Sequence, residues 1–466
     1  MSTAIWWIRR DLRLSDNQAL QAALTHAEVI IPVFILDPKL LNSSSASQNR
    51  ITFLFNGLRT LDNELHKRGS LLVVQQGDPL SVLHTLVNAT DATGIFAEAD
   101  ISPYSVKRDT RVRKELPLTL APGVTVHPPD SLRKSDGSPY TIFTPFRHMW
   151  QKLLLPGKPF PAPERLSTPP SISNLGVPAN PSQSSDTLFK AGEAEARRRL
   201  EEFCDYTLYH YAGDRNRLDL DGTSRLSPYL RFGMLSARQV AWAIRLAEEQ
   251  ASNAASQQSV ESWANELIWR DFYSAILFHF PFVSRTAFRP NMREINWRED
   301  PVGFSAWAEG YTGFPVVDAG MRQMNSTGWM HNRARMITAS FLTKDLLINW
   351  QEGERYFMNH LLDGDPAANN GGWQWTAGTG TDAAPYFRIF NPVLQGKKFD
   401  PHGAYVRQWI PELAAIPDAY IHTPWEMPSE LQKKLSCVIG KDYPAPIVNH
   451  TMARQRVLDV YRKSAA

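Results

Sequence analysis

The sequence has little cysteine, no large excess of charge and no long apolar run. Cys204 and Cys437 are the only cysteines among 466 residues, which excludes a disulfide framework and a four-cysteine zinc site. This scarcity is typical of a reducing compartment, so we predict a cytoplasmic protein. No run approaches the roughly 18 apolar residues of a membrane-spanning helix. Residues 1–11 lack the apolar centre of a secretory signal.

Positive and negative charges nearly balance, with 50 Lys and Arg against 47 Asp and Glu and a net charge of +3. That balance excludes a polycation and a highly charged disordered chain, while a local basic groove for DNA stays compatible with it. Aromatic residues are plentiful instead: 22 Phe, 14 Tyr and 14 Trp. The plainest interpretation of so many tryptophans is packing in a large helical core.

The first 130 residues alternate short apolar runs with helical stretches. Residues 4–8 and 29–36 are continuous apolar segments, typical of strands buried on both faces. We therefore predict a doubly wound parallel sheet, an α/β domain over residues 1–130, with ligands at the carboxyl ends of its strands. Pro and Ser then dominate a predicted interdomain linker over residues 131–190. The remainder, residues 191–466, is predicted to be an all-α domain.

Helix-length apolar spacing recurs through that last part, for example over residues 314–328 and 333–349. Neither a Walker phosphate loop nor GxGxxG occurs, and HExxH is absent. The twelve histidines have no ligand spacing, so we predict no metal site. The segment TSRLS at residues 223–227 has three hydroxyls and a guanidinium, which suits a phosphate cradle. An ordinary helix cap is the alternative.

A second polar group includes Arg333 and Arg335, which would point to different faces of a helix, so that one can face inward and then needs an acidic partner. Residues 363–375 (DGDPAANNGGWQW) supply two carboxylates, two asparagine amides and two indoles, which we expect in one loop. This composition suits recognition of a heteroaromatic ring. A metal at Asp363 and Asp365 is the weaker alternative, because no further ligands accompany them.

A third group lies in one predicted helix, where Glu266, Trp269, Arg270 and Tyr273 share a face at i, i+3, i+4 and i+7. Such a stripe can stack a base and hold a phosphate. A half-buried helix with two exposed charges is the alternative.

Together these segments resemble the photolyase/cryptochrome family, and in particular the microbial class I cyclobutane pyrimidine dimer photolyases. The matching segments are residues 9–13, 223–227, 265–273, 312–323, 326–347, 363–375 and 388–396. The resemblance implies a carbon–carbon lyase with noncovalent FAD in the helical domain, active as reduced FADH⁻. It implies that the excited flavin passes an electron to a dimer flipped out of DNA, that the cyclobutane ring splits and that the electron returns.

The resemblance also assigns residues. FAD contacts are expected at Tyr211, Thr223, Ser224, Arg225, Leu226, Ser227, Asn332, Arg335, Asp363, Gly364, Asp365 and Asn369. Asn369 is expected to face flavin N5, and an electron relay is expected to run from Trp373 through Trp350 to Trp297 at the surface. The dimer pocket is expected at Glu266, Trp269, Met336 and Trp375, with further DNA contacts at Arg270, Tyr273, Asn332, Arg333, Gln395 and Lys397.

Two details follow from the same resemblance. The (6-4) photolyases have paired histidines where this chain reads His331-Asn332, so the sequence favours the cyclobutane dimer. Antenna contacts are expected at Leu36, Asp37, Arg50, Asp100 and Tyr104. These residues favour 8-hydroxy-5-deazaflavin or a second flavin over folate, or an empty pocket.

The main alternative function is a cryptochrome-like blue-light photoreceptor, against which Asn369 argues. A second alternative is a DNA-binding flavoprotein with dark redox activity, which is disfavoured because the sequence shows no nicotinamide site. A third is a structural DNA-binding module, which would not need the carboxylates, amides and indoles of segment 363–375. The expected partner is DNA containing pyrimidine dimers. We predict a monomer with no obligate protein partner.

Overall fold

A computed structural model describes residues 2–43, 46–169, 172–181 and 188–465. The chain forms two compact units: residues 1–212 with 223–281 (unit 1), and residues 213–222 with 282–466 (unit 2). Residues 170–171 and 182–187 of the predicted linker lie outside the described residues. The predicted domain boundaries at residues 130 and 190 stay a prediction.

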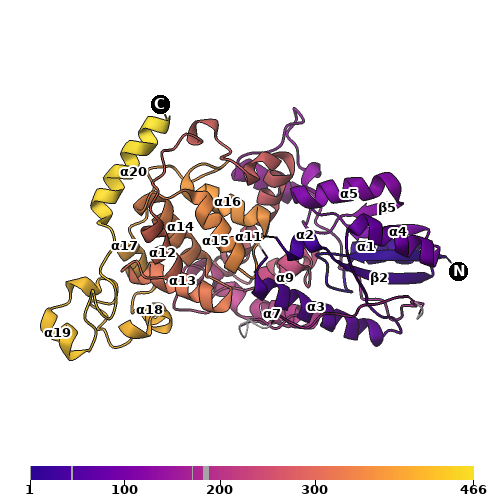
Figure 1. Cartoon of the computed structure of the whole chain (residues 1–466), viewed down its shortest axis with the longest axis horizontal. Helices are drawn as coiled ribbons and strands as arrows, with labels where there is room; N and C mark the ends of the chain where they lie inside the picture. The colour runs from indigo at the N-terminus through magenta and orange to yellow at the C-terminus, as the bar shows by residue number, and fades with distance from the viewer. Residues whose placement is uncertain (1, 44–45, 170–171, 182–187, 466) are drawn as a thin grey trace. The chain divides into compact units, whose positions relative to one another are not determined.

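A parallel sheet of five strands lies in unit 1 (Figure 1). Its strands are β1 (Thr3–Ile8), β2 (Val29–Leu36), β3 (Val73–Gln76), β4 (Gly94–Glu98) and β5 (Leu118–Ala121). The order β3-β2-β1-β4-β5 reverses direction at β1, so the switch point lies between β1 and β4. After Thr3, β1 and β2 are apolar because both faces are covered, and Ile5 pairs with Ile31 in their register. The doubly wound sheet predicted for the N-terminal part is confirmed.

Five helices accompany the sheet: α1 (Gln18–His26), α2 (Pro38–Leu41), α3 (Gln48–His66), α4 (Pro79–Thr90) and α5 (Pro103–Glu115). Their starts follow local capping rules. The side chains of Asn17, Asp78 and Ser102 accept backbone N–H groups at the beginnings of α1, α4 and α5. Because these caps directly follow strands or short turns, polar side chains gather at the strand ends.

The rest of unit 1 is helical: α6 (Phe143–Lys152), α7 (Glu193–Asp205), α9 (Ser227–Phe232), α10 (Ala237–Gln250) and α11 (Ala254–His279), with η1 (Pro129–Ser131) and η2 (Thr207–His210). The long helix α11 contacts α6 and α10. Asp271 of α11 accepts the indole N–H of Trp150 and the backbone N–H of Val126, both at 3.0 Å. Burial raises the pKa of Asp271 to about 6. These bonds anchor part of the predicted linker to α11.

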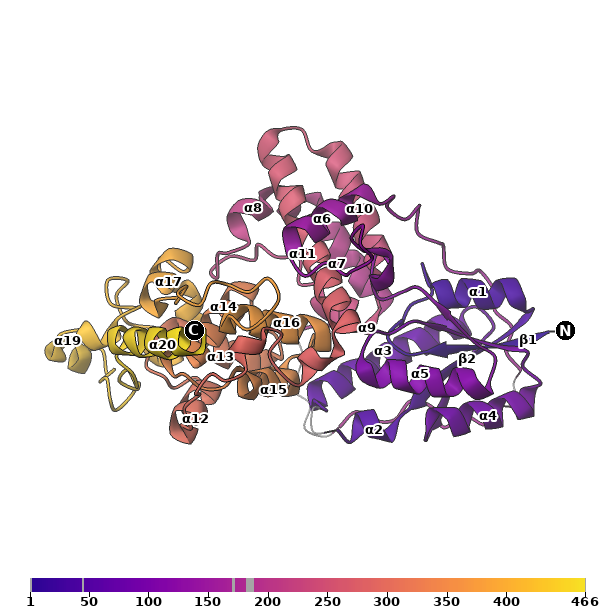
Figure 2. The same ribbon diagram turned by 90° about the horizontal axis from the view of Figure 1, so that it is seen from above.

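Unit 2 is built from helices (Figure 2), in which α13 contacts α14 and α16 contacts α14 and α15. The longer helices are α12 (Pro301–Glu309), α13 (Pro315–Thr327), α14 (Asn332–Ser340), α15 (Trp350–His360), α16 (Pro366–Ala377), α17 (Pro392–Phe399), α18 (Ala404–Trp409), α19 (Ser429–Lys434) and α20 (His450–Ala465). Short ones are η4 (Pro290–Met292), the π-helix η5 (Phe341–Asp345), η6 (Pro411–Leu413) and η7 (Pro424–Glu426). The unit boundaries at residues 212–213 and 281–282 fall within α8 (Tyr211–Asp214) and η3 (Pro281–Ser284). The all-α fold predicted for the C-terminal part is confirmed.

Two local expectations for unit 2 are wrong. The single helix expected over residues 333–349 ends as α14, continues as η5 and then stops, and Leu347 has a left-handed backbone (φ 58°). The segment 363–375, expected as a loop, forms most of α16. The physical reason is the pair Asp365-Pro366, because an aspartate N-cap followed by proline at the first helical position starts a helix.

Among the described residues, no helix is long and apolar enough to cross a bilayer. A search of the same residues finds no group of three or more His, Cys, Asp or Glu side chains that could hold a metal ion.

The π-helix carries a lysine in the core of unit 2. Lys344 is 1% exposed, and its Nζ donates to the Ala377 carbonyl at 2.9 Å and lies 3.7 Å from the ring centroid of Tyr461. No ion pair with a carboxylate is found for it in the described part of the chain. Burial lowers the pKa of Lys344 to about 7.

We expect Lys344→Met to stabilise the protein by about 2 kcal/mol at about pH 6. The shift from 10.5 to about 7 corresponds to ~5 kcal/mol, of which the cation–π contact and the hydrogen bond recover ~3 kcal/mol. The penalty is complete below about pH 7, where the buried amine must carry charge, and it falls as pH rises towards the ordinary pKa. Because the penalty falls by about 1.4 kcal/mol per pH unit above about pH 7, denaturant unfolding should show the gain at about pH 6 and little or none at about pH 9.

The exposed Lys434→Met serves as the control and should leave stability within about 0.5 kcal/mol at both pH values. A loss of stability in Lys344→Met at about pH 6, or an equal gain at both pH values, contradicts the prediction.

Candidate functional site

One face of α14 presents three of the predicted side chains. Asn332 is exposed, and Arg335 and Met336 are half-buried, at i, i+3 and i+4. The helix begins after His331, whose Nδ1 accepts the Arg333 backbone N–H at 3.0 Å.

Arg335 and Asp363 form the ion pair that the sequence predicts. Arg335 Nη2 lies 2.7 Å from Asp363 Oδ2, and Arg335 Nε donates to the Met330 carbonyl at 2.9 Å. The Asp363 side chain is 3% exposed, and its Oδ1 is buried without a hydrogen-bond partner. A buried carboxylate oxygen without a hydrogen bond lowers the stability of the protein, so its presence fits a site where a bound ligand donates to it.

Asp365 has a structural task in this region. Its Oδ1 accepts the backbone N–H groups of Ala367 and Ala368 at 2.9 and 3.1 Å and caps α16. Gly364, between the two carboxylates, is buried. The cap therefore holds Asp363 and the start of α16 in a fixed relation.

Asn369 lies in the first turns of α16 and its amide has a defined partner. Its Nδ2 donates to the backbone carbonyl of Glu354 in α15 at 3.0 Å. The amide nitrogen is thus engaged, and Oδ1 is left to accept a hydrogen bond from a ligand N–H. Sequence reasoning missed Glu354, and no local pattern identifies it, because its contact is made between two helices.

The three predicted relay tryptophans share one apolar cluster in unit 2. Trp373 and Trp350 are 2% and 3% exposed, and Trp297 is a half-buried residue at its edge. Trp373 lies against Gly353, where a Cβ atom would come within 2.1 Å of the indole. Only glycine permits this approach of α15 to the ring. Exposure increases from Trp373 and Trp350 to Trp297, and the electron relay stays a prediction.

Trp307 also contacts Trp373, edge to face at 6.1 Å, and it was not among the predicted residues.

In unit 1 the predicted phosphate segment follows Tyr211, which is buried and meets Phe203 edge to face. Arg225 has a left-handed backbone (φ 49°), a strained conformation for a non-glycine residue. α9 begins without a side-chain cap, because Leu226 stands at the N-cap position. The remaining predicted members, Thr223, Ser224 and Ser227, are half-buried or exposed.

The stripe on α11 is present as predicted in spacing and exposure: Glu266, Trp269, Arg270 and Tyr273 are all half-buried. The Trp269 ring stacks on Phe143, with centroids 3.6 Å apart and planes at 2°. Phe143 lies in the predicted linker and was missed, because nothing in the local sequence links it to α11. It fixes the orientation of the Trp269 ring.

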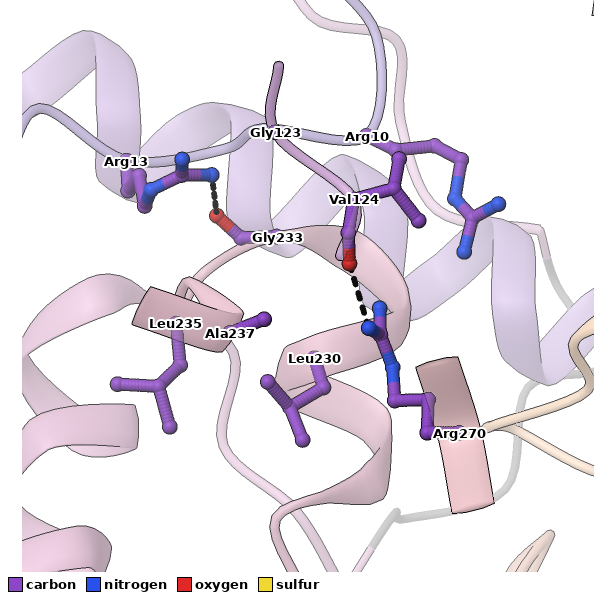
Figure 3. A pocket seen from close by; sticks show the side chains of 9 residues that line it. All are labelled: Arg10, Arg13, Gly123, Val124, Leu230, Gly233, Leu235, Ala237 and Arg270. Atoms are coloured by element: carbon purple, nitrogen blue, oxygen red, sulfur yellow. Dashed lines mark hydrogen bonds between the residues drawn. The ribbon is translucent and has the colours of Figure 1, made fainter. Parts of the chain in front are cut away.

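Arg270 is tied to its own unit. Its Nη1 donates to the Val124 carbonyl, and it lines a small hollow with Arg10 and Arg13 (Figure 3). Part of its guanidinium is therefore already engaged, and its DNA contact stays a prediction.

Other predicted DNA contacts lie in unit 2. Arg333 donates twice to Asn216 Oδ1 (3.1 and 2.6 Å) and lies over the Phe399 ring at 4.5 Å. Burial and the nearby charge of Arg215 lower the pKa of Arg333. Arg215 and Asn216 were missed, since they come from a distant segment. The other predicted residues here are the half-buried Trp375, the half-buried Gln395 with an unpaired buried Oε1, and the exposed Lys397.

The predicted antenna residues lie at or beyond the carboxyl ends of β2 and β4. The Tyr104 hydroxyl donates to Asp37, which directly follows the buried Leu36, and Asp100 pairs with Arg10 at 3.4 Å. Although burial raises the pKa of Asp100, Arg10 and the Ser102 N–H hold it well below its usual range. Arg50 lies in α3, where its N–H donates to Ser47.

The same edge carries a basic cluster of Arg9, which follows β1 where the sequence places a strand end, and Arg108, which was not among the predicted antenna residues. Arg9 pairs with Asp109 at 2.6 Å, and the guanidiniums of Arg9 and Arg108 lie 4.9 and 4.8 Å from the Trp7 ring. Arg9 Nε and Arg108 Nη2 are buried without partners. These donors stand next to the switch point, where an open parallel sheet binds ligands.

Two family descriptions match the chain: DNA photolyase over residues 4–164, and the FAD binding domain of DNA photolyase over residues 263–463. The chain belongs to the DNA photolyase family. This photolyase is 40% identical to the deoxyribodipyrimidine photo-lyase of Escherichia coli strain K12, over 99% of this chain and 98% of that protein. It is 38% identical to the enzyme of that name from Synechococcus sp., over 99% and 97%.

Solved structures agree with this assignment. A bacterial class III photolyase from Agrobacterium tumefaciens superposes with a TM-score of 0.93 at 36% identity, over 100% of this chain and 98% of the other. The archaeal photolyase of Sulfolobus tokodaii with two FAD molecules gives 0.83 at 33% identity, over 99% and 100%. A cryptochrome of Synechocystis sp. PCC6803 gives 0.90 at 31% identity, over 99% of each chain.

The residues of this photolyase fit FAD. Asp363 offers a buried unpaired acceptor, and the Asn369 carbonyl is free of its own helix. Both lie within the segment that matches the FAD binding domain.

Proposed function

We propose that this photolyase splits cyclobutane pyrimidine dimers in DNA with light and reduced FAD. The observation that carries the proposal is the extent of the match. The match spans 97–98% of the length of the relatives named deoxyribodipyrimidine photo-lyase, at 38–40% identity. Asn369, Arg335 and Asp363 support it, because they provide an acceptor for flavin N5–H and an anchored carboxylate.

FAD, when bound and reduced, supplies the light-excited electron that splits the dimer. The chain's own residues bind, orient and exclude water. Arg335 holds Asp363, whose unpaired Oδ1 would accept a hydrogen bond from the cofactor. The Glu354 backbone carbonyl holds the Asn369 amide nitrogen, so the amide oxygen would be available to accept a hydrogen bond from the cofactor. Trp269, supported from behind by Phe143, offers an aromatic face to a flipped base.

Phosphate contacts are proposed for Arg333 and for Arg215, whose charge acts on Arg333. Because such contacts release counterions, DNA affinity should fall as salt rises. Contacts to the dimer are proposed for Glu266 of unit 1, as a hydrogen-bond acceptor, and for Met336 of unit 2, as an apolar contact.

The deciding experiment is light-dependent repair. The purified protein should show a flavin spectrum and, after chemical reduction, should remove dimers from a thymine-dimer oligonucleotide in light and not in darkness. A matched oligonucleotide carrying a (6-4) product should stay unrepaired. Bound flavin without dimer loss would instead support a cryptochrome-like photoreceptor, and absence of flavin would refute both readings.

For the antenna we propose a deazaflavin or a second flavin at the carboxyl end of the sheet. The buried unpaired donors of Arg9 and Arg108 support this, since both ligands carry carbonyl acceptors on a flat ring. The archaeal photolyase with two FAD molecules is a precedent in a similar fold. An absorption band in excess of one flavin per chain, lost in Arg108→Ala, is the result to look for.

The class I assignment, the monomeric state and the cytoplasmic location also stay predictions. The similar Agrobacterium structure is described as class III.

A further inference from the structure

Glu354 holds two consecutive amides of α16. Its backbone carbonyl accepts Asn369 Nδ2 at 3.0 Å, and its carboxyl Oε1 accepts Asn370 Nδ2 at 2.9 Å. Asn370 Oδ1 accepts Gln374 Nε2 at 3.1 Å, and both of these side chains donate to the Val283 carbonyl at 2.9 and 3.0 Å. This chain of bonds fixes the rotation of α16 about its axis.

The same residue lies between the two functional parts of α16. Its neighbour Gly353 receives the Trp373 ring, and Trp373 follows Asn369 by one helical turn. A change at Glu354 therefore acts on the residue expected to face N5 and on the helix that carries the first relay tryptophan.

The charge of Glu354 is little compensated. Segment 366–377, which forms α16, has no ionisable side chain, and Glu352 pairs with Arg355 at 2.5 Å on α15 itself. The charged side chains on the elements in contact with α15, besides His360 on α15 itself, are Arg285, Glu309, Lys344 and Asp345. Burial raises the pKa of Glu354 to about 7, against the Asn370 hydrogen bond and the charge of Arg355.

We propose that Glu354 is a positioning residue of the flavin site, which holds Asn369 and Asn370 in place and makes reduction of the bound flavin harder when its carboxyl is ionised. The inference rests on one part of the proposed function, the binding of flavin beside Asn369, and does not require dimer repair. An ionised carboxylate repels the negative charge of reduced flavin, and by linkage the reduced flavin favours the protonated acid. Below about pH 7 the acid is neutral and reduction is easier; above it the carboxylate opposes reduction.

The test is a reductive titration of the flavin-loaded protein at about pH 6 and about pH 8, for the native chain, Glu354→Gln and the control Glu352→Gln. At about pH 8 the ratio of reduced to oxidised flavin at one applied potential should be about tenfold higher in Glu354→Gln than in the native chain, the order expected for one nearby charge. At about pH 6 the two should agree, and Glu352→Gln should follow the native chain throughout.

A second variant separates charge from structure. Asn370→Ala removes the hydrogen bond that lowers the Glu354 pKa, so the pH step should move upward without disappearing. In the flavin-free protein, infrared titration of the native chain should show a protonated carboxyl lost near pH 7, a band missing from Glu354→Gln. That readout needs neither flavin nor repair.

The proposal is overturned if the ratio of reduced to oxidised flavin in Glu354→Gln equals that of the native chain at both pH values. It is also overturned if the infrared spectrum of the native chain lacks the carboxyl band. Either result leaves dimer repair untouched, whereas absence of dimer loss with these titrations intact would overturn the proposed function alone.

Discussion

Asp363→Ala is expected to weaken flavin retention about a hundredfold. The substitution leaves the Arg335 guanidinium, whose side chain is 25% exposed, without its carboxylate at 2.7 Å. It also removes the buried Oδ1 proposed to accept from the cofactor. A hydrogen bond that involves a charged group is worth about 1.5–3 kcal/mol, and about 2.7 kcal/mol corresponds to a hundredfold change in the dissociation constant. Flavin absorbance per chain after dialysis, and the dissociation constant on reconstitution, measure the effect.

Two companion variants make this result interpretable. Asp363→Asn keeps an oxygen acceptor and loses the charge, so it should lie between the native chain and Asp363→Ala. Asp418→Ala removes the carboxylate of an exposed pair with Arg407 and should retain flavin fully. Native flavin affinity in Asp363→Ala, with an unchanged melting temperature, would contradict the assigned role.

Trp297→Phe is expected to block light-driven reduction of oxidised flavin and to spare dimer repair by protein that has already been reduced. Trp297 is half-buried at the edge of the cluster that encloses Trp350 and Trp373, so it is the ring placed to exchange electrons with a reductant in solution. Phenylalanine keeps most of the apolar contact and removes the oxidisable indole. Flavin absorbance during illumination with a thiol reductant measures the first effect, and dimer loss measures the second.

Trp307→Phe is the matched control, since Trp307 also contacts Trp373 but is 0% exposed. It should leave photoreduction near the native rate. Photoreduction that survives in Trp297→Phe and fails in Trp307→Phe would indicate that electrons reach Trp373 through Trp307 instead. Loss of repair in pre-reduced Trp297→Phe would refute the relay role altogether.

Local and repetitive features of this protein could be predicted from its sequence. The continuous apolar runs at residues 4–8 and 29–36 dictate strands buried on both faces, because only a doubly covered sheet removes every side chain from water. The i, i+3, i+4, i+7 spacing of the α11 stripe survives folding, because helix geometry alone places those residues on one side. The pairing of Arg335 with Asp363 was also expected, because the family resemblance implied it and an inward-facing guanidinium needs an acidic partner.

Local spacing misjudged two segments. The glycines and amides of segment 363–375 suggested a loop, yet Asp365 and Pro366 start a helix there. The helix expected over residues 333–349 stops early, where Leu347 adopts a left-handed backbone in the core. In both places a single cap or backbone turn outweighs the average propensity of the segment.

Only the tertiary structure decided which residues serve the predicted ones. Phe143 backs Trp269 from more than a hundred residues away, Asn216 holds Arg333, and Glu354 sets the Asn369 amide. None of these contacts follows from spacing, because each joins elements whose distance along the chain carries no information about their distance in space. The amino-acid sequence determined the elements and the residues of the candidate site; packing between helices determined how those residues are held.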